Sequence, residues 1–359
     1  MTAASEMKAL RRKLLRWYRA NRRDLPWRRT RDPYAIWLSE SMLQQTRVET
    51  VIPYWERFLA RFPTVEDLAR APLDDVLTLW AGLGYYSRAR NLHRAAQTMV
   101  ERHEGRVPDD GDALRELPGV GRYTAGAVAS IAFDRAEPIV DGNVARVFAR
   151  IFGIEEDVKS TPVVKRLWQE AAELVRGASP GDFNQALMEL GATVCVPRGP
   201  RCLACPVSEH CVAYREGLTQ SLPRKTKKAP PRPVAAVAGW MERRGQVLMV
   251  QRPAEGLLGG LWELPGGDLL PDEEPASALA RCLRERMGLD VPGADELGII
   301  EHVFSHLHMR VHVFRCKAPE GRVRRRDFAA HRWLAPEAID TLAIGGPTRK
   351  ALRLLGQVR

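Results

Sequence analysis

Glu40 occupies a position that suits acid chemistry. It follows Ile36 by four residues and precedes Leu43 by three, so it lies on the apolar stripe of a predicted helix. Burial disfavours the charged form of a carboxylate and raises its pKa. A glutamate here therefore keeps its proton near neutral pH, as a general acid must. The spacing is equally compatible with a glutamate that is hydrogen-bonded in the core and has no catalytic role.

Asp141 directly precedes a second predicted helix. The stretch GNVARVFARIF places apolar residues at positions 144, 147, 148, 151 and 152, so a helix begins just after this aspartate. A carboxylate at a helix start accepts hydrogen bonds from free backbone N–H groups and faces the positive end of the helix dipole, which keeps it ionised. Such a carboxylate can stabilise positive charge in a substrate, and it can equally be an ordinary helix cap.

Gly119 and Gly121 open another helix in the stretch LPGVGRYTAGAVASIAF. Glycines before a helix leave the first N–H groups unobstructed, and these groups can bind a phosphate oxygen. The small residues that follow allow close approach of neighbouring backbones. The glycine pair alone fits an ordinary helix start, and a contact with phosphate is the alternative.

Four of the six cysteines form a closely spaced set, namely Cys195, Cys202, Cys205 and Cys211. Their C-x6-C-x2-C-x5-C spacing fits a metal site in a reducing compartment better than a disulfide framework. Four thiolates can hold either an iron–sulfur cluster or zinc. His210 lies inside this loop and is predicted not to be a ligand.

The charge of the chain suits a polyanionic partner. Its 359 residues carry a formal net charge of +11, although a basic surface without a nucleic-acid role is an alternative. Residues 8–32 mix arginine with tryptophan, as surfaces for phosphates and bases do, and Arg28 in this segment is predicted to bind DNA. A solvated amphipathic helix is the alternative for this segment.

The N-terminus lacks the pattern of a secretion signal, and nowhere do eighteen apolar residues run together. We therefore expect a cytoplasmic protein, associated with the nucleoid if the source is bacterial, that does not bind membranes and acts as a monomer.

The elements that position these residues fall into two predicted domains, because the chain is long enough for two cores. Residues 217–233 are proline-rich and basic and predict a linker between domains at 1–216 and 234–359. In the first domain, DFNQALMELG predicts a helix that ends just before Gly191. In the second, VAAVAGWMERRGQVLMVQRP predicts a β-hairpin.

The stretch EHVFSHLHMRVHVFR alternates polar and apolar residues and predicts a single strand. One face of that strand would carry His302, His306, His308, Arg310 and His312. A zinc site on this face is disfavoured, because neighbours on one face of a strand lie about 6–7 Å apart and no closing ligand is evident.

Several motifs together resemble one family of DNA repair enzymes. LPGVGRYTA, set between two helical patterns, resembles the helix-hairpin-helix of base-excision DNA glycosylases, and VDGNV resembles the loop with their catalytic aspartate. RDLPWR, DPYAIWLSESMLQQT and LWAGLGYYSRARNLHRAA narrow the resemblance to adenine DNA glycosylases of the MutY type. The resemblance implies an all-α glycosylase domain at 1–216 in which the four cysteines hold a 4Fe–4S cluster.

The same resemblance assigns further roles. Gln45 and Tyr85 match residues that probe and wedge the duplex beside an extruded base, and Tyr123 and Asn143 match hydrogen-bonding neighbours of the two catalytic carboxylates. Glycosylases with lyase activity carry a lysine where this chain has Tyr123, and tyrosine cannot form a Schiff base.

Residues 234–359 resemble the Nudix fold of MutT-type pyrophosphatases, an α+β fold. Counting from Gly267, the motif G-x5-E-x7-R-E-U-x-E-E-x-G-U has two failures, at Cys282 and Arg286. A metal site built from carboxylates is thereby left with a cation in its midst, so we expect no pyrophosphate hydrolysis. By the same family resemblance, Phe304, Ser305 and His306 form an FSH motif that recognises 8-oxoguanine.

These observations predict a monofunctional adenine glycosylase that acts on double-stranded DNA containing adenine opposite 8-oxoguanine or guanine. The alternatives are an endonuclease III-like glycosylase and lyase for oxidised pyrimidines, a non-catalytic iron–sulfur module that binds DNA, and a nucleotide hydrolase.

Overall fold

The chain folds into two compact units in a computed structural model. The structure describes residues 3–226, 229–317, 319, 321–324 and 326–357. One unit combines Met1–Arg70 with Asn91–Lys227, and the other combines Ala71–Arg90 with Lys228–Arg359. Lys227 and Lys228, within the predicted linker, lie outside the described residues.

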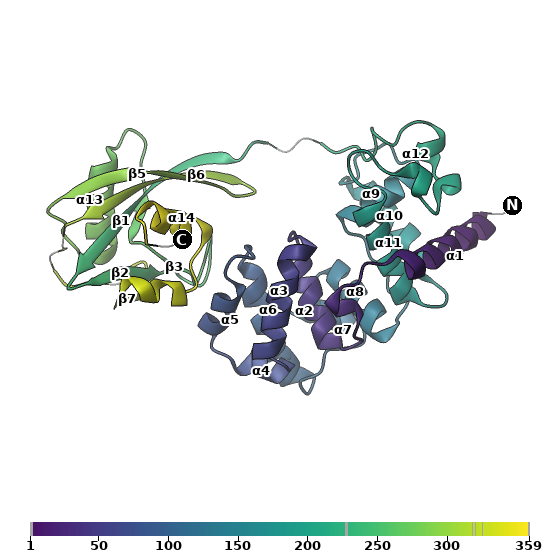
Figure 1. The fold of residues 1–359 in the computed structure, drawn as a ribbon, viewed down its shortest axis with the longest axis horizontal. Coiled ribbons are helices and arrows are strands. Elements are labelled where there is room, and N and C mark those ends of the chain that lie inside the picture. The colour runs from purple at the N-terminus through teal and green to yellow at the C-terminus, as the bar shows by residue number, and fades with distance from the viewer. Residues whose placement is uncertain (1–2, 227–228, 318, 320, 325, 358–359) are drawn as a thin grey trace. The chain divides into compact units, whose positions relative to one another are not determined.

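The described part of the first unit is helical (Figure 1). Its elements are α1 (Ala3–Asn21), η1 (Pro26–Arg28), α2 (Pro33–Leu43), α3 (Val48–Arg61), α4 (Val65–Arg70), most of α6 (Ser87–Arg102), α7 (Gly111–Glu116), α8 (Arg122–Phe133), α9 (Gly142–Ile151), α10 (Thr161–Val175), α11 (Pro180–Thr193), η2 (Cys202–Ala204), η3 (Ser208–His210) and α12 (Val212–Arg215). Apolar side chains of α1, α8, α9, α10 and α11 form a shared core.

Small residues set the spacing between these helices. A Cβ on Gly126 of α8 would lie 2.1 Å from the carbonyl oxygen of Pro138, and one on Gly181 of α11 would lie 2.3 Å from that of Ser130. The expectation that a helix ends before Gly191 is wrong, because α11 continues to Thr193. Gly191 is required for packing instead, since its Cβ would lie 2.7 Å from the Cβ of Asn143.

The second unit contains a sheet of seven strands. Its elements are α5 (Leu73–Trp80), β1 (Arg232–Arg243), β2 (Gln246–Gln251), β3 (Trp262–Glu263), β4 (Gly266–Asp268), α13 (Pro275–Met287), β5 (Ala294–Val303), β6 (Leu307–Cys316), β7 (Ala330–Leu334), η4 (Pro336–Thr341) and α14 (Gly346–Leu354). The strand order is β3-β2-β1-β6-β5, with β4 paired to β1 and β7 to β2. Successive side chains along the strands point to opposite faces of the sheet and pack into two separate cores. One core also contains side chains of α13, and the other contains side chains of α14.

The predicted hairpin is confirmed, since β1 and β2 pair antiparallel around Arg244 and Gly245, both with positive φ. The prediction of one strand over residues 301–315 is wrong. β5 ends at Val303 and β6 begins at Leu307, and the two run antiparallel, because the chain reverses where the N–H of Phe304 donates to the carbonyl of Leu307 at 2.7 Å. His302 and His308 therefore lie on different strands.

Candidate active site

A cavity of about 180 Å³ opens in the first unit and collects most of the predicted catalytic residues. Of the residues singled out from the sequence, its wall contains Arg28, Glu40, Tyr123, Asp141 and Asn143. The wall also contains residues that the sequence reasoning missed, among them Arg23, Trp27, Gln185, Met188 and Glu189. The helices α2, α8, α9 and α11 thus meet at one hollow.

Glu40 lies on α2 and only 4% of it is exposed. The hydroxyl of Tyr123, on α8, donates to its Oε2 at 2.9 Å. Burial raises the pKa of Glu40 to about 7, against the lowering effect of the Tyr123 hydrogen bond and with a smaller rise from the charge of Asp141. Burial therefore favours the protonated form of Glu40 at a pH where an exposed glutamate is ionised.

Asp141 caps α9, as the sequence predicts. Its Oδ1 accepts from the N–H of Val144 at 2.7 Å, and its Oδ2 accepts from the side-chain amide of Asn143 at 3.1 Å. Burial raises the pKa of Asp141, and the hydrogen bonds of the cap oppose that rise. The cap therefore moderates the effect of burial and does not reverse it.

Asn143 and Arg146 connect this cap to the cysteine loop. The guanidinium of Arg146 donates to Oδ1 of Asn143 at 2.9 Å, to the carbonyl of Gly191 at 2.8 Å and to the carbonyl of Cys195 at 2.8 Å. The side-chain amide of Asn143 in turn contacts Asp141. The position of the Asp141 carboxylate is thus fixed from α11 and from the first cysteine.

Glu189 forms an ion-pair network with two arginines in the cavity wall. Its side chain is fully buried and accepts from Arg23 at 2.8 and 2.9 Å and from Arg28 at 2.8 Å. Burial would raise the pKa of Glu189, but these hydrogen bonds outweigh it and lower the pKa to about 2. Arg28, predicted to bind DNA, is 9% exposed, so it can face a base inside the cavity rather than a phosphate at the surface.

The four cysteines line a second cavity in the first unit. Among the described residues, which include all four, no three His, Cys, Asp or Glu side chains lie close enough to hold a single metal ion. Four thiolates around one cavity are a donor set that can hold an iron–sulfur cluster or zinc.

Arg150 supplies positive charge to this cavity. It is 1% exposed, and its guanidinium donates to Sγ of Cys195 at 3.3 Å and to the carbonyls of Val196 and Leu222 at 2.8 and 3.0 Å. Burial raises the pKa of Cys205 to about 12, so without a cationic group this thiol holds its proton. The donor set therefore suits a cofactor whose iron replaces those protons.

Other predicted residues are not among those that line this cavity. Gln45 is exposed and has a positive φ just beyond α2, while Gly119 (φ +76°) and Gly121 precede α8. Tyr85 belongs to the second unit, where it is 47% exposed with a φ of +48°. Phe304, Ser305 and His306 form the turn between β5 and β6.

Comparison with known proteins decides among the functions considered. Residues 38–173 match the family model described as HhH-GPD superfamily base excision DNA repair protein, and residues 236–354 match that of the NUDIX domain. Adenine DNA glycosylase of Homo sapiens is 41% identical over 98% of this chain and 74% of its own length. That of Mus musculus is 40% identical over 98% and 78%.

The chain belongs to the adenine DNA glycosylase family.

Solved structures agree with the fold of this glycosylase. A thermostable thymine-DNA glycosylase superposes with a TM-score of 0.55 at 34% identity, covering 59% of this chain and 98% of its own. Endonuclease III in a non-covalent DNA complex superposes with a TM-score of 0.52 at 22% identity, over 61% and 99%, which shows the fold alone. The prediction of a helix-hairpin-helix domain followed by a Nudix-like domain is confirmed. The prediction that the chain is a base-excision DNA N-glycosylase acting on adenine is confirmed as well. None of the described helices is long and apolar enough to span a membrane.

Proposed function

We propose that this adenine glycosylase removes adenine opposite 8-oxoguanine or guanine, with Glu40 as the general acid. The observation that carries the proposal is the cavity in which a buried Glu40, with a pKa of about 7, lies in the same wall as the capped Asp141. Two carboxylates in such different environments suit one acid and one anion.

The reaction begins with adenine extruded from the duplex, at a cost of a few kcal/mol. Glu40 delivers its proton to N7 of the base, and the bond between C1′ and N9 breaks with its electron pair leaving on adenine. Asp141 stabilises the oxocarbenium-like sugar. Water then adds to C1′, and Glu40 takes up the proton that the water loses. Tyr123 offers no amine, so the enzyme forms no Schiff base and the product is an intact abasic site.

A glycosylase assay tests this proposal on duplexes with A opposite 8-oxoguanine, G, T and C. We expect base removal with A opposite 8-oxoguanine and G, and strand scission only after alkali. Efficient trapping of the enzyme on its substrate by borohydride would show an amine nucleophile and contradict the water mechanism.

We further propose that Cys195, Cys202, Cys205 and Cys211 hold a 4Fe–4S cluster. The cavity that they line and the guanidinium of Arg150 beside Cys195 support it. Such a cluster would cross-link the loop that Arg146 and Arg150 join to α9. We expect iron and sulfide with visible absorbance in the purified protein, both lost in Cys202→Ser; stoichiometric zinc instead would overturn this assignment.

We also propose that the turn Phe304–His306 recognises the base opposite adenine. Ser305 and His306 are exposed there, and the Ser305 hydroxyl lies 3.4 Å from Nδ1 of His306. One hydrogen bond to a base edge contributes about 1–3 kcal/mol, so Ser305→Ala should reduce the preference for 8-oxoguanine over guanine by about fivefold to 150-fold. An unchanged ratio of the two excision rates would contradict this role.

A further inference from the structure

The NUDIX match implies a divalent cation, and the segment where it would bind departs from that expectation. The segment runs from β4 into α13, and the metal-binding pattern calls for glutamates at three positions of α13, namely 282, 285 and 286. Here Cys282 and Arg286 occupy two of the three. Among the described residues no group of three or more potential ligands is found. The residues present therefore do not fit a divalent metal.

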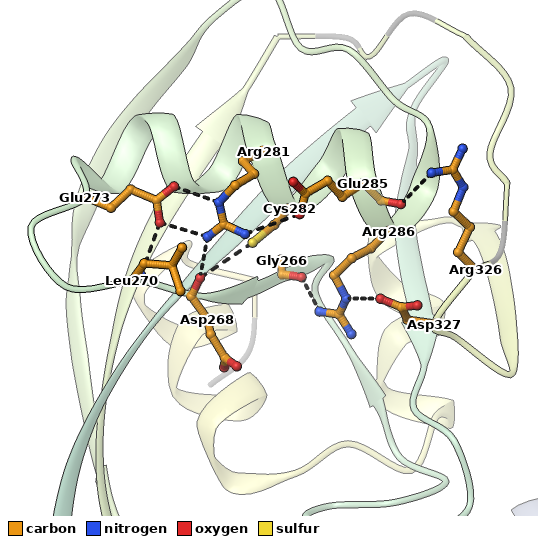
Figure 2. Close-up of polar contacts among 10 residues, drawn as sticks. All are labelled: Gly266, Asp268, Leu270, Glu273, Arg281, Cys282, Glu285, Arg286, Arg326 and Asp327. Atoms are coloured by element: carbon orange, nitrogen blue, oxygen red, sulfur yellow. Dashed lines mark hydrogen bonds and ion pairs between the residues drawn. The ribbon is translucent and has the colours of Figure 1, made fainter.

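Arg286 makes the contacts that a cation would make. Figure 2 shows its guanidinium between Gly266 of β4 and Asp327, which precedes β7. It donates to the backbone carbonyl of Gly266 and, at 3.1 Å, to the carboxylate of Asp327. The guanidinium also lies 4.3 Å from the ring centre of Phe328. One positive group thus joins a carbonyl oxygen, a carboxylate and an aromatic face.

Gly267 of β4 leaves room for the side chain of Arg286 because it has no side chain of its own. A Cβ on Gly267 would lie 3.1 Å from the nearest guanidinium nitrogen of Arg286 and 2.7 Å from Sγ of Cys282. Cys282 itself is 2% exposed and packs with the α13 core. The space beside the Gly266 carbonyl is therefore filled by Arg286 and by a buried thiol.

The remaining carboxylates of the motif are paired with a second arginine. Arg281 binds both oxygens of Glu273, at 2.7 and 2.8 Å, and also reaches Glu285 at 3.4 Å (Figure 2). Hydrogen bonds from Arg281 lower the pKa of Glu273 to about 2. Glu273 and Glu285 are therefore engaged by a guanidinium that belongs to the chain.

We propose that the guanidinium of Arg286 replaces the divalent cation of a Nudix motif, so that the junction of β4 and α13 is held together without metal. Substitution of Arg286 and Cys282 by glutamate should reverse this replacement and restore a site for a divalent cation. Glutamates at positions 282, 285 and 286 would lie at i, i+3 and i+4 on one face of α13, and with the Gly266 carbonyl they would supply oxygen ligands of the kind that Mg²⁺ and Mn²⁺ prefer. The double variant Cys282→Glu with Arg286→Glu should thus create a metal site.

The test uses the full-length protein with Mn²⁺ as the probe. Isothermal titration measures binding, and hydrogen exchange reports the protection of backbone amides at 266–268 and 281–287. In the unsubstituted protein we expect no Mn²⁺ binding and no change in protection with Mn²⁺ or EDTA. In the double variant we expect lower protection without metal, one bound Mn²⁺, and protection restored when Mn²⁺ is added.

Two control variants separate this outcome from general damage. Arg284→Glu reverses the same charge on α13 at a side chain that is 68% exposed, and should neither bind Mn²⁺ nor lose protection. Arg286→Met should lose protection that Mn²⁺ does not restore. The proposal is overturned if the unsubstituted protein binds Mn²⁺ at this segment, if Arg286→Met keeps full protection, or if the folded double variant fails to bind Mn²⁺.

Discussion

Glu40 in the cavity of the first unit and Glu273 in the β4–α13 segment have pKa values that are shifted in opposite directions. Burial raises the pKa of Glu40 to about 7, and the hydrogen bond from the neutral hydroxyl of Tyr123 lowers this pKa by less than burial raises it. Glu273 is bound at both oxygens by Arg281, so its pKa falls to about 2. A carboxylate keeps a proton for chemistry where its partner is neutral, and it becomes a structural anion where its partner is a guanidinium.

Glu189 shows that burial does not decide between these outcomes. It shares the cavity wall with Glu40 and is fully buried, yet Arg23 and Arg28 bring its pKa to about 2. The buried ion pairs leave Glu189 charged and fixed. Within one cavity, then, the hydrogen-bonding partner of each carboxylate decides whether its pKa is raised, as for Glu40, or lowered, as for Glu189.

The largest effect is expected from Glu40→Gln, which keeps the shape of the side chain and removes its acid. General acid catalysis contributes about 10²–10⁴-fold in rate, and we expect a loss at least that large in single-turnover excision of adenine. Binding to duplex DNA should be unchanged. A near-normal excision rate would show that Glu40 is not the acid.

Asp141→Asn should have the next largest effect. Asparagine is as good a helix cap as aspartate, so α9 should remain intact while the negative charge facing the sugar is lost. We expect a fall in the single-turnover rate of about 10²-fold or more, with unchanged circular dichroism. A rate loss that scales with loss of helix would point to a purely structural aspartate.

The pH dependence gives a finer test of the same assignment. Because the protonated form of Glu40 is the active one, the single-turnover rate should fall as pH rises through about 7. The Tyr123 hydrogen bond stabilises the carboxylate and lowers that pKa, so Tyr123→Phe should move the alkaline limb to higher pH. A limb that stays in place would show that Glu40 is not the titrating group.

The smallest effect on catalysis is expected from Glu273→Gln. This pKa is depressed in the folded protein, so the carboxylate contributes stability above its unfolded pKa of about 4.5, and that contribution is lost as pH falls through about 2. The variant should excise adenine at the normal rate and lose some stability at neutral pH but none at pH 2. A change in excision rate would contradict a purely structural role.

The sequence predicts much of the site because its signals are local. The apolar spacing around Glu40 and the helix start after Asp141 each lie within one helical turn, and both predictions are confirmed in the fold. Glu189 on α11 is buried as well, but its role depends on ion pairs with arginines more than 160 residues away. Such pairing arises only when α11 packs against the N-terminal segment.

Two local predictions failed for physical reasons. The turn at Phe304–His306 contains neither glycine nor proline, so no turn residue marks it. Alternation is regular only from Leu307 onward, and the prediction of one strand ignored the two apolar and two polar residues in succession at 303–306. Gly191 has the form of a helix stop signal, but a glycine is also required where two helices approach closely. Which of these two roles a glycine has depends on whether a neighbouring helix packs against it, and a single sequence does not show that.

The close approach of α11 to α9 at Gly191 also determines what a substitution of this glycine would do. Its carbonyl accepts from Arg146, and its missing side chain leaves the room in which Asn143 stands. An added methyl group would press on the residue that hydrogen-bonds Asp141, at a point outside the cavity wall. A side chain added at Gly191 would therefore displace Asn143 and with it the carboxylate of Asp141, and the overlap between α11 and α9 would also lower the stability of the fold.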